Sequence, residues 1–350
     1  MLRRSKHFLL NFAERAGFLR LAQIPLHDAG NYLFVLMYHR VAELDDPLSN
    51  RLYDLVSASP GIFDRQMRLL SSCFRPVSAE DVLEAVNGGK PLPAQAVLVT
   101  VDDGYRDFKE TIYPIAKKYG IRPVLFVATA YVGGGVFWWD RLYNAIVNTR
   151  LVEADTPLGK FPLKDKAERL AAFEALADYV SMQPFETSRR DIEELCDRIL
   201  PNGHLNVSYT LNWNELRALS ADGATIAPHT HNHPILTHIP AEKARDEIRV
   251  SMDLVKRQIG TALPVFAYPD GGEYAVSAEV ASILKEEGIQ AAFTVSNRIS
   301  CLKQDAPLLF PRITPQPSMS LAQFHLSLTA LRRPKNRPLY ESQHSRDYIH

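Results

Sequence analysis

The chain has little cysteine and no excess of charge of either sign, and these absences exclude whole classes of protein. Its 350 residues include only three cysteines, Cys73, Cys196 and Cys301, which are odd in number and widely spaced. A disulfide framework is therefore not expected, and a reducing compartment is. The 40 basic residues equal the 40 acidic ones, so the charge balance gives no support for a nucleic-acid partner and we expect none.

Long apolar runs are also absent. No stretch reaches the roughly 18 apolar residues of a transmembrane helix. The N-terminal apolar stretch is interrupted by Asn11 and is too short for a secretory signal. Residues 1–27 instead form a basic amphipathic segment, which either packs on the main domain, the more frequent case, or contacts an anionic membrane surface through residues 1–24. We expect a cytoplasmic protein, located at the inner face of the membrane in the second case.

Between residues 28 and 330, short apolar runs alternate with amphipathic stretches, which is the pattern of one α/β domain. The runs predict strands at 34–38, 96–101, 124–128, 224–227, 265–268 and 291–295. The amphipathic stretches predict helices near 62–72, 79–87, 106–119, 241–259 and 277–287. Asn212 and Glu215 have the spacing of a capping box that opens a further helix. Such alternation favours a parallel sheet, either open or closed into a barrel.

Two segments depart from this alternation. Residues 135–210 contain the pair Trp138-Trp139 and a charged helical stretch around 164–200, and we expect a mostly helical insertion there. The tail at 331–350 holds prolines and charges with few apolar residues, so it is expected to be extended or disordered.

Residues that can carry chemistry follow four of the predicted strands. They are Tyr38-His39, Asp102-Asp103, the histidines at 229–233, and Tyr268-Pro269-Asp270. In a barrel the residues after the strands converge on one mouth, where active sites form, whereas an open sheet spreads most of them along a line. The sequence therefore favours an α/β fold built on a distorted or incomplete (β/α) barrel with a helical insertion.

The richest candidate site combines adjacent carboxylates with a cluster of histidines. Asp102 and Asp103 follow the strand at 96–101, and four of the eleven histidines lie within ten residues, from His229 to His238. One carboxylate and two imidazoles leave a position open for water on a metal ion, and a second carboxylate beside them can act as a base. Each motif alone is also typical of a turn or a polar loop, so it is their combination that indicates metal-assisted hydrolysis.

Three further residues or turns are weaker candidates. The Gly-rich turn that contains Tyr268 and Asp270 can aim backbone N–H groups at a developing oxyanion, although a plain loop is the simpler interpretation. His39 ends the strand at 34–38, where a lone histidine is more often structural than catalytic. Arg312 is placed late in the chain and can orient a carboxylate, although surface arginines are common.

Taken together, these segments resemble the polysaccharide deacetylase family, the NodB-homology domain of carbohydrate esterase family 4. The family motif Thr-Phe-Asp-Asp-Gly is similar to Thr100-Val101-Asp102-Asp103-Gly104. The family motif His-Ser/Thr-x-x-His is similar to the segment from His229 to His233. The resemblance implies that Asp102 is the general base and that Asp103, His229 and His233 hold a divalent metal, for which we expect zinc.

Two other family motifs are incomplete in this chain. The motif Arg-x-Pro-Tyr has Ala267-Tyr268-Pro269-Asp270 in its place, so the arginine that braces the base must come from elsewhere, and Arg312 is the candidate. A backbone N–H at Asp270 can still serve the oxyanion. The late motif Leu-x-Leu-His, whose histidine is the general acid, has no clear match, and His39 and His325 are its candidate substitutes.

These observations predict a metal-dependent hydrolase that removes N-acetyl groups from an N-acetylated sugar in a glycan or glycan precursor. Trp138, Trp139, Trp213 and Tyr268 are candidates to stack on sugar faces, although core packing is the commoner role. An O-acetyl esterase that uses the same site is one alternative. A non-catalytic glycan-binding or assembly protein is another, because two motifs are incomplete. A barrel glycosidase is disfavoured, since it needs two separated carboxylates rather than a metal site.

Overall fold

The computed structural model describes residues 32–43, 55–183, 185–201, 203 and 209–329. The N-terminal basic segment at 1–27 and the tail at 331–350, both expected from the sequence, lie outside these residues. Within the described part of the chain, no helix combines the length and the apolar character that crossing a membrane requires.

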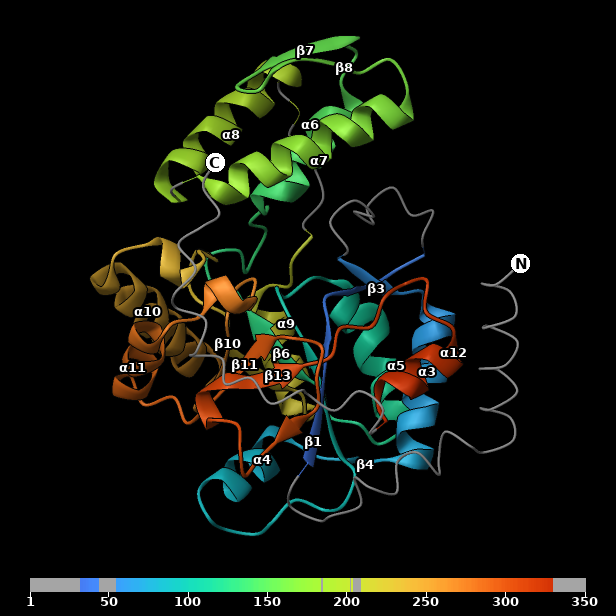
Figure 1. Ribbon diagram of the computed structural model, residues 1–350, viewed down its shortest axis with the longest axis vertical. Coiled ribbons are helices and arrows are strands. Elements are labelled where there is room, and N and C mark those ends of the chain that lie inside the picture. Colours follow the sequence, from blue (N-terminus) through green and yellow to red (C-terminus); the bar gives the residue numbers. More distant parts are fainter. Residues whose placement is uncertain (1–31, 44–54, 184, 202, 204–208, 330–350) are drawn as a thin grey trace.

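Parallel strands form the centre of the molecule (Figure 1). One sheet contains four adjacent parallel strands, in the order β1 (Tyr32–Tyr38), β5 (Ala96–Val101), β6 (Val124–Val127) and β9 (Thr225–Pro228), with β9 at its edge. A second sheet continues with β10 (Val265–Ala267), β11 (Ala291–Val295) and β13 (Phe310–Arg312). Short strands extend the first sheet, with β4 (Arg75–Pro76) beside β5 and β12 (Ser300–Cys301) antiparallel to β1. A separate pair consists of β2 (Arg40–Val41) and β3 (Val56–Ala58).

The two sheets approach a barrel without closing it. β13 joins β1 through a bridge between Leu36 and Ile313, in which the Met37 N–H donates to the Ile313 carbonyl at 2.9 Å. On the other side, β9 and β10 belong to different sheets, and no ladder between them occurs in the described residues. The predicted distorted or incomplete (β/α) barrel is therefore confirmed. We call the line between β9 and β10 the seam.

Helices cover the outside of the strands because the strands are apolar on both faces. β5, for example, is buried at every position, as expected of a parallel strand that has a core inside and helices outside. The covering helices are α3 (Pro60–Cys73), α4 (Ala79–Val86), α5 (Tyr113–Lys118), α9 (Trp213–Ala221), α10 (Ala241–Ile259), α11 (Ala278–Glu286) and α12 (Leu321–Ser327). The short helical turns are η3 (Phe108–Ile112), η4 (Leu236–His238), η5 (Glu273–Ala275) and η6 (Pro307–Leu309). The predicted capping box of α9 is present, with the Glu215 N–H donating to Asn212 Oδ1 at 3.0 Å.

The insertion at 135–210 stands beyond the barrel mouth, in green at the top of Figure 1. It contains α6 (Trp138–Asn148), α7 (Lys166–Met182) and α8 (Phe185–Ile199). It also contains a hairpin that the sequence did not predict, formed by β7 (Glu153–Thr156) and β8 (Gly159–Pro162). Its two ends lie side by side, since the Gly133 N–H donates to the Leu211 carbonyl at 2.9 Å and the Thr210 hydroxyl donates to the Tyr131 carbonyl at 2.6 Å. The insertion is thus anchored next to the strand ends that carry the candidate site.

Candidate active site and metal centre

The two adjacent carboxylates lie where β5 ends. The Asp102 N–H donates to the Tyr38 carbonyl at 2.9 Å, which continues the pairing of β5 with β1. Asp103 and Gly104 then adopt left-handed backbone conformations, with φ of 77° and 88°. The turn is tight, because a Cβ at Gly104 would come within 3.2 Å of Val127 Cγ1. It places both carboxylates in the barrel mouth, where each residue is only 2% exposed.

A strained loop after β9 carries the two histidines. Thr230 and His233 have φ of 63° and 59°, a region that costs residues other than glycine about 1 kcal/mol or more. Local hydrogen bonds hold this backbone. The Thr230 hydroxyl accepts from the His233 N–H at 3.0 Å, and Glu247 on α10 accepts from two further N–H groups of the loop at 2.8 and 2.7 Å. The rings of His229 and His233 consequently lie 4.8 Å apart.

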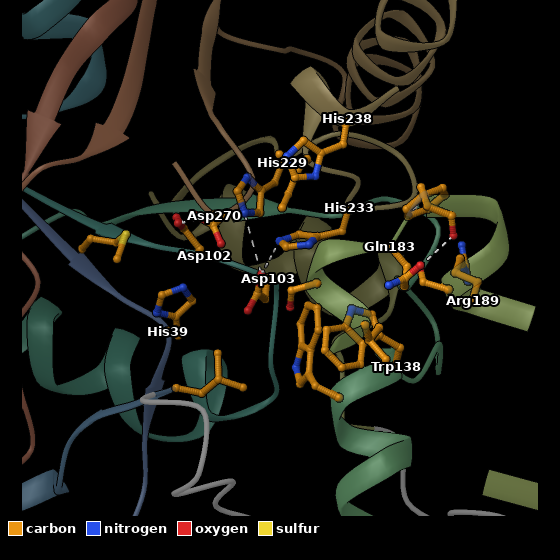
Figure 2. Close-up of a pocket in the computed structure, with 18 residues that line it drawn as sticks. His39, Asp102, Asp103, Trp138, Gln183, Arg189, His229, His233, His238 and Asp270 are labelled. Atoms are coloured by element: carbon orange, nitrogen blue, oxygen red, sulfur yellow. Dashed lines mark hydrogen bonds and ion pairs between the residues drawn. The ribbon is translucent and has the colours of Figure 1, made fainter. Parts of the chain in front are cut away.

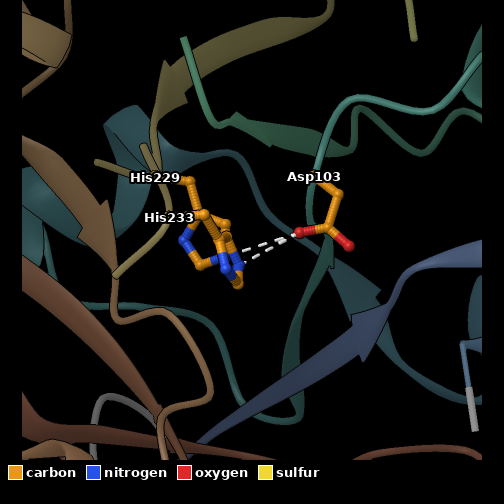
Figure 3. Close-up of side chains that lie close together, drawn as sticks. All are labelled: Asp103, His229 and His233. Atoms are coloured by element: carbon orange, nitrogen blue, oxygen red, sulfur yellow. Dashed lines mark ion pairs between the residues drawn. The ribbon is translucent and has the colours of Figure 1, made fainter. Parts of the chain in front are cut away.

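Asp103, His229 and His233 form a compact ligand set (Figure 3). Asp103 Oδ1 lies 3.4 Å from His233 Nε2 and 3.8 Å from His229 Nε2, and one ligand atom from each residue lies within 4.8 Å of the others. Ligand atoms bound at about 2.0–2.2 Å to a tetrahedral ion are separated by roughly 3.3–3.6 Å, so small shifts make the set fit a divalent metal. Asp103 Oδ1 is buried without a hydrogen-bond partner among the described residues, which a cation would supply.

The surroundings of His229 prepare its Nε2 as a ligand. Its Nδ1 lies 2.7 Å from the Ala267 carbonyl. A carbonyl only accepts, so Nδ1 carries the proton and the Nε2 lone pair is free to bind an ion. Burial lowers the pKa of His229 to about 4, because loss of water disfavours the imidazolium. The ring is therefore neutral at pH 7, which is the form that binds metal.

Arg312 braces Asp102 from behind the pocket. The guanidinium Nη1 donates to Asp102 Oδ1 at 2.8 Å, and Nη2 lies 2.8 Å from Oδ2. Nη1 also donates to Thr100 Oγ1 at 3.2 Å, and Nε donates to the Thr294 carbonyl at 3.2 Å. Arg312 itself lies in β13 and is fully buried. The contact between Arg312 and Asp102 that the sequence predicts is therefore confirmed.

Both carboxylates of the pair are ionised. Burial raises the pKa of Asp102, but the charge of Arg312 outweighs it and leaves the pKa below its ordinary value. Burial likewise raises the pKa of Asp103, while the close approach of the His233 imidazole outweighs burial and lowers the pKa to about 2. Arg312 thus neutralises Asp102, whereas Asp103 faces imidazoles and keeps its charge available for a cation.

The ligand set opens into a pocket of ≈ 230 Å³ between the barrel mouth and the insertion (Figure 2). His39 and Asp270 lie on its barrel side, and His39 Nδ1 is buried without a hydrogen-bond partner among the described residues. The insertion supplies the opposite wall, which includes Trp138, Trp139, Val180, Gln183, Phe185 and Arg189. Trp139 packs edge-on against the His233 ring, with ring centres 5.2 Å apart, and the other residues of this wall line the rest of the pocket.

Three predicted residues lie outside this pocket. Tyr268 is 1% exposed, its ring packs edge-on against Phe266, and its hydroxyl donates to the Leu308 carbonyl at 3.0 Å. This differs from the predicted substrate contact, because the ring is directed into the core around β10. Trp213 packs against the main hydrophobic core at the start of α9. His325 is buried on α12, so of the two candidate acids only His39 lines the pocket.

Several residues that shape the site have no recognisable signal in the sequence. Thr294 and Ala267 act through backbone carbonyls, which any residue has. Glu247 resembles any charged residue on an amphipathic helix. Gln183 and Arg189 reach the pocket only because the insertion folds back over the barrel mouth. Arg312, in contrast, could be predicted, because the family motif lacks its arginine in this chain and another arginine was needed to brace Asp102.

Comparison with known proteins agrees with this geometry. The family model "Polysaccharide deacetylase" matches residues 89–292. The poly-beta-1,6-N-acetyl-D-glucosamine N-deacetylase of Escherichia coli (strain K12) is 46% identical over 46 residues, which are 13% of this chain and 7% of that protein. The match therefore spans a small part of that relative's length.

Solved structures share the fold. A Streptococcus pyogenes deacetylase, PplD in complex with acetate, has a TM-score of 0.58 at 18% identity, covering 85% of this chain and 98% of that chain. IcaB from Ammonifex degensii has a TM-score of 0.56 at 18% identity, and the match covers 86% of this chain and 99% of that chain. The family model covers more than half of this chain and includes both motifs of the ligand set. The chain therefore belongs to the polysaccharide deacetylase family.

Proposed function

We propose that this chain is a metal-dependent hydrolase that removes N-acetyl groups from an N-acetylated sugar in a glycan or glycan precursor. The observation that carries the proposal is the ligand set Asp103, His229 and His233 beside a second buried carboxylate, Asp102, in one pocket. A glycan-binding module has no use for a carboxylate braced by an arginine next to a metal site. The similarity to the Escherichia coli poly-beta-1,6-N-acetyl-D-glucosamine N-deacetylase supports an N-acetylated amino sugar as the substrate.

In this proposal Asp103, His229 and His233 hold the ion, and a set of two nitrogens and one oxygen favours zinc. When bound, the ion acts as a Lewis acid toward the acetamide carbonyl and lowers the pKa of water. The protein prepares these ligands in advance. Because the His229 pKa is about 4 and the Asp103 pKa about 2, neither ligand has to lose a proton near pH 7 before the ion binds.

Asp102 takes a proton from the attacking water. Its Oδ2 lies 4.0 Å from His229 Nε2, so the carboxylate borders the ligand set without belonging to it. The low pKa keeps Asp102 ionised and able to accept a proton across the neutral range. Arg312 fixes the plane of the carboxylate through both oxygens. General-base assistance of this kind contributes about 10²–10⁴-fold to the rate.

His39 and the turn at Asp270 complete the proposed chemistry. His39 donates a proton to the leaving amine, a role supported by its place in the pocket and by its unpaired Nδ1 among the described residues. Asp270 lies in a left-handed turn at the pocket, with φ of 63°. Its backbone N–H is proposed to donate to the oxyanion that develops on the acetyl group.

Metal analysis of the purified protein, paired with acetate release from matched N-acetylated and O-acetylated oligosaccharides, tests the proposal. The expected result is a divalent metal in the protein and release of acetate from the amide substrates, which is lost on chelation and restored by zinc. Acetate from the esters alone would identify an O-acetyl esterase. Binding of the oligosaccharides without acetate release would identify a non-catalytic glycan-binding protein.

A further inference from the structure

The wall that the insertion contributes to the pocket has no role in the proposed acetyl chemistry. It carries a cation, Arg189 on α8, and an aromatic ring, Trp138 at the start of α6. Figure 2 shows Arg189 on the side of the pocket opposite His39. A substrate whose acetamido group lies at the metal ligands therefore presents the rest of its structure to this wall.

Arg189 is held in place by neutral partners. Its Nη1 donates to Asn232 Oδ1 at 3.3 Å, and its guanidinium lies 5.5 Å from the Phe185 ring centre and 5.8 Å from that of Tyr131. Asn232 is itself fixed, since its Nδ2 donates to Glu247 Oε1 at 2.7 Å. Aromatic faces and an amide oxygen orient a guanidinium without neutralising it.

The other arginines near the site each have a carboxylate partner. Arg312 pairs with Asp102, Arg40 lies 3.4 Å from Asp107, and Arg141 pairs with Asp197 at 2.8 Å. Among the side chains that the structure describes, which do not include that of Glu186, no carboxylate lies within ion-pair distance of Arg189, and only one of its five N–H donors is engaged. The pocket wall thus offers a positive charge and an open planar fork to a ligand.

We propose that Arg189 binds an anionic group of the substrate, a carboxylate or a phosphate, on or next to the N-acetylated sugar. A guanidinium fork matches both anions with two parallel hydrogen bonds, and Trp138 offers an apolar face to the sugar ring beside it. The inference rests on the proposed deacetylase function and specifies its substrate class, an acidic or phosphorylated amino-sugar glycan. Arg189 selects the substrate and takes no part in the acetyl transfer to water.

Three probes test this assignment by calorimetry on the zinc-loaded protein. They are N-acetylglucosamine, N-acetylglucosamine 1-phosphate, and a disaccharide of N-acetylglucosamine and glucuronic acid. The wild-type protein is expected to bind at least one anionic probe roughly 10- to 100-fold more tightly than the neutral sugar, the range expected for a charge-assisted pair. The phosphate and carboxylate probes separate the two sources of the anion.

The variants Arg189→Ala and Arg190→Ala form a matched pair. Arg190 is the next residue on α8, 70% exposed at its side chain and outside the pocket lining. Arg189→Ala is expected to remove the preference for the anionic probe and to leave binding of the neutral sugar unchanged, whereas Arg190→Ala keeps the preference. Equal loss in both variants, equal loss for neutral and anionic probes, or no preference in the wild-type protein would overturn the inference.

Acetate release from the same probes separates this inference from the proposed function. Arg189-dependent binding of an anionic probe without any acetate release supports the subsite and overturns the deacetylase proposal. Acetate release at equal kcat/KM from neutral and anionic probes, unaffected by Arg189→Ala, supports the deacetylase proposal and overturns the subsite.

Discussion

Arg312 and Asp102 lie 210 positions apart in the chain and meet through the two terminal guanidinium nitrogens and both carboxylate oxygens, with Nη1–Oδ1 and Nη2–Oδ2 each at 2.8 Å. A lysine would keep the charge but has no planar fork. The two-point contact therefore fixes the orientation of the proposed base, which a positive charge alone would not do.

Arg312→Lys is expected to lower kcat/KM by about 10- to 100-fold, because small misplacements of a reacting group carry costs of this size. Metal content and the circular dichroism spectrum are expected to stay unchanged. Arg298→Lys is the matched control, since Arg298 makes a similar two-point pair with Asp305 at 2.9 and 2.7 Å outside the pocket lining. An Arg312→Lys enzyme within about threefold of wild-type kcat/KM would show that orientation by the fork is unimportant.

Replacement of any one ligand, as in Asp103→Ala, His229→Ala or His233→Ala, is expected to lower both metal content and activity. Two remaining ligands hold a divalent ion too weakly to survive purification. His238→Ala is the control, because His238 lines the pocket but does not belong to the ligand set. Wild-type metal stoichiometry in all three ligand variants, measured by atomic emission, would refute the assignment.

Asp102→Asn is expected to retain metal and to lose about 10²–10⁴-fold in turnover, the contribution of a general base. The change also leaves the buried Arg312 without its counter-charge, which costs about 3–5 kcal/mol of folding free energy. Urea unfolding therefore accompanies the kinetic assay and fixes a temperature at which the variant is folded. If metal is lost and activity returns with added zinc, Asp102 is a ligand rather than the base.

Asp140 predicts a pH dependence of stability. It is 5% exposed, and the Tyr105 hydroxyl donates to its Oδ2 at 2.8 Å. Burial raises its pKa from 3.8 to about 7. The folded state therefore holds the proton more tightly than the unfolded state. As pH rises from about 4 to 7, ionisation of this group lowers the free energy of unfolding. Above about pH 7 the loss is complete and amounts to about 4 kcal/mol.

Asp140→Asn keeps an acceptor for the Tyr105 hydroxyl and removes the ionisation. We expect the variant to unfold at a higher urea concentration than the wild-type protein at pH 8, with a gain that shrinks steadily toward pH 5. Asp197→Asn serves as the control, since the Asp197 side chain is 69% exposed. A difference between Asp140→Asn and wild type that is independent of pH would contradict the proposed ionisation.

The N-terminal basic segment gives a further prediction, which concerns residues outside the described part of the chain. Deletion of residues 1–24 is expected to release the protein from vesicles of mixed neutral and anionic phospholipids, because the basic face is removed. Acetate release is expected to stay intact. Loss of solubility on deletion would instead support a helix packed on the main domain.

Much of the barrel could be predicted from the sequence, since its strands are apolar runs bounded by polar residues. The predicted strand at 96–101 coincides with β5, and that at 291–295 with β11. β13 was missed because it has three residues with Pro311 in the middle, and proline normally argues against a strand in a sheet interior. The hairpin of β7 and β8 was missed because its alternation of apolar and polar residues is weak.

The sequence could predict those site residues that directly follow a predicted strand. Asp102 and Asp103 follow β5 directly, so their place at the mouth follows from the direction of the strand. The turn after β10 shows the limit of this reasoning, because Asp270 lines the pocket while Tyr268, two residues earlier, is buried in the core. The insertion's contribution depends on the tertiary path of the chain, which local pattern does not contain.

The seam between β9 and β10 connects the proposed metal to the integrity of the whole barrel. The proton on His229 Nδ1 bonds the Ala267 carbonyl at 2.7 Å across this line, while Nε2 of the same ring faces Asp103. An ion bound at Nε2 would immobilise the His229 ring, which connects the two sheets through this hydrogen bond. A ligand that binds only the folded state stabilises that state. Zinc would then slow backbone hydrogen exchange in β9 and β10 more than in β1 and β5, so that breathing of the barrel and release of the ion become one cooperative event.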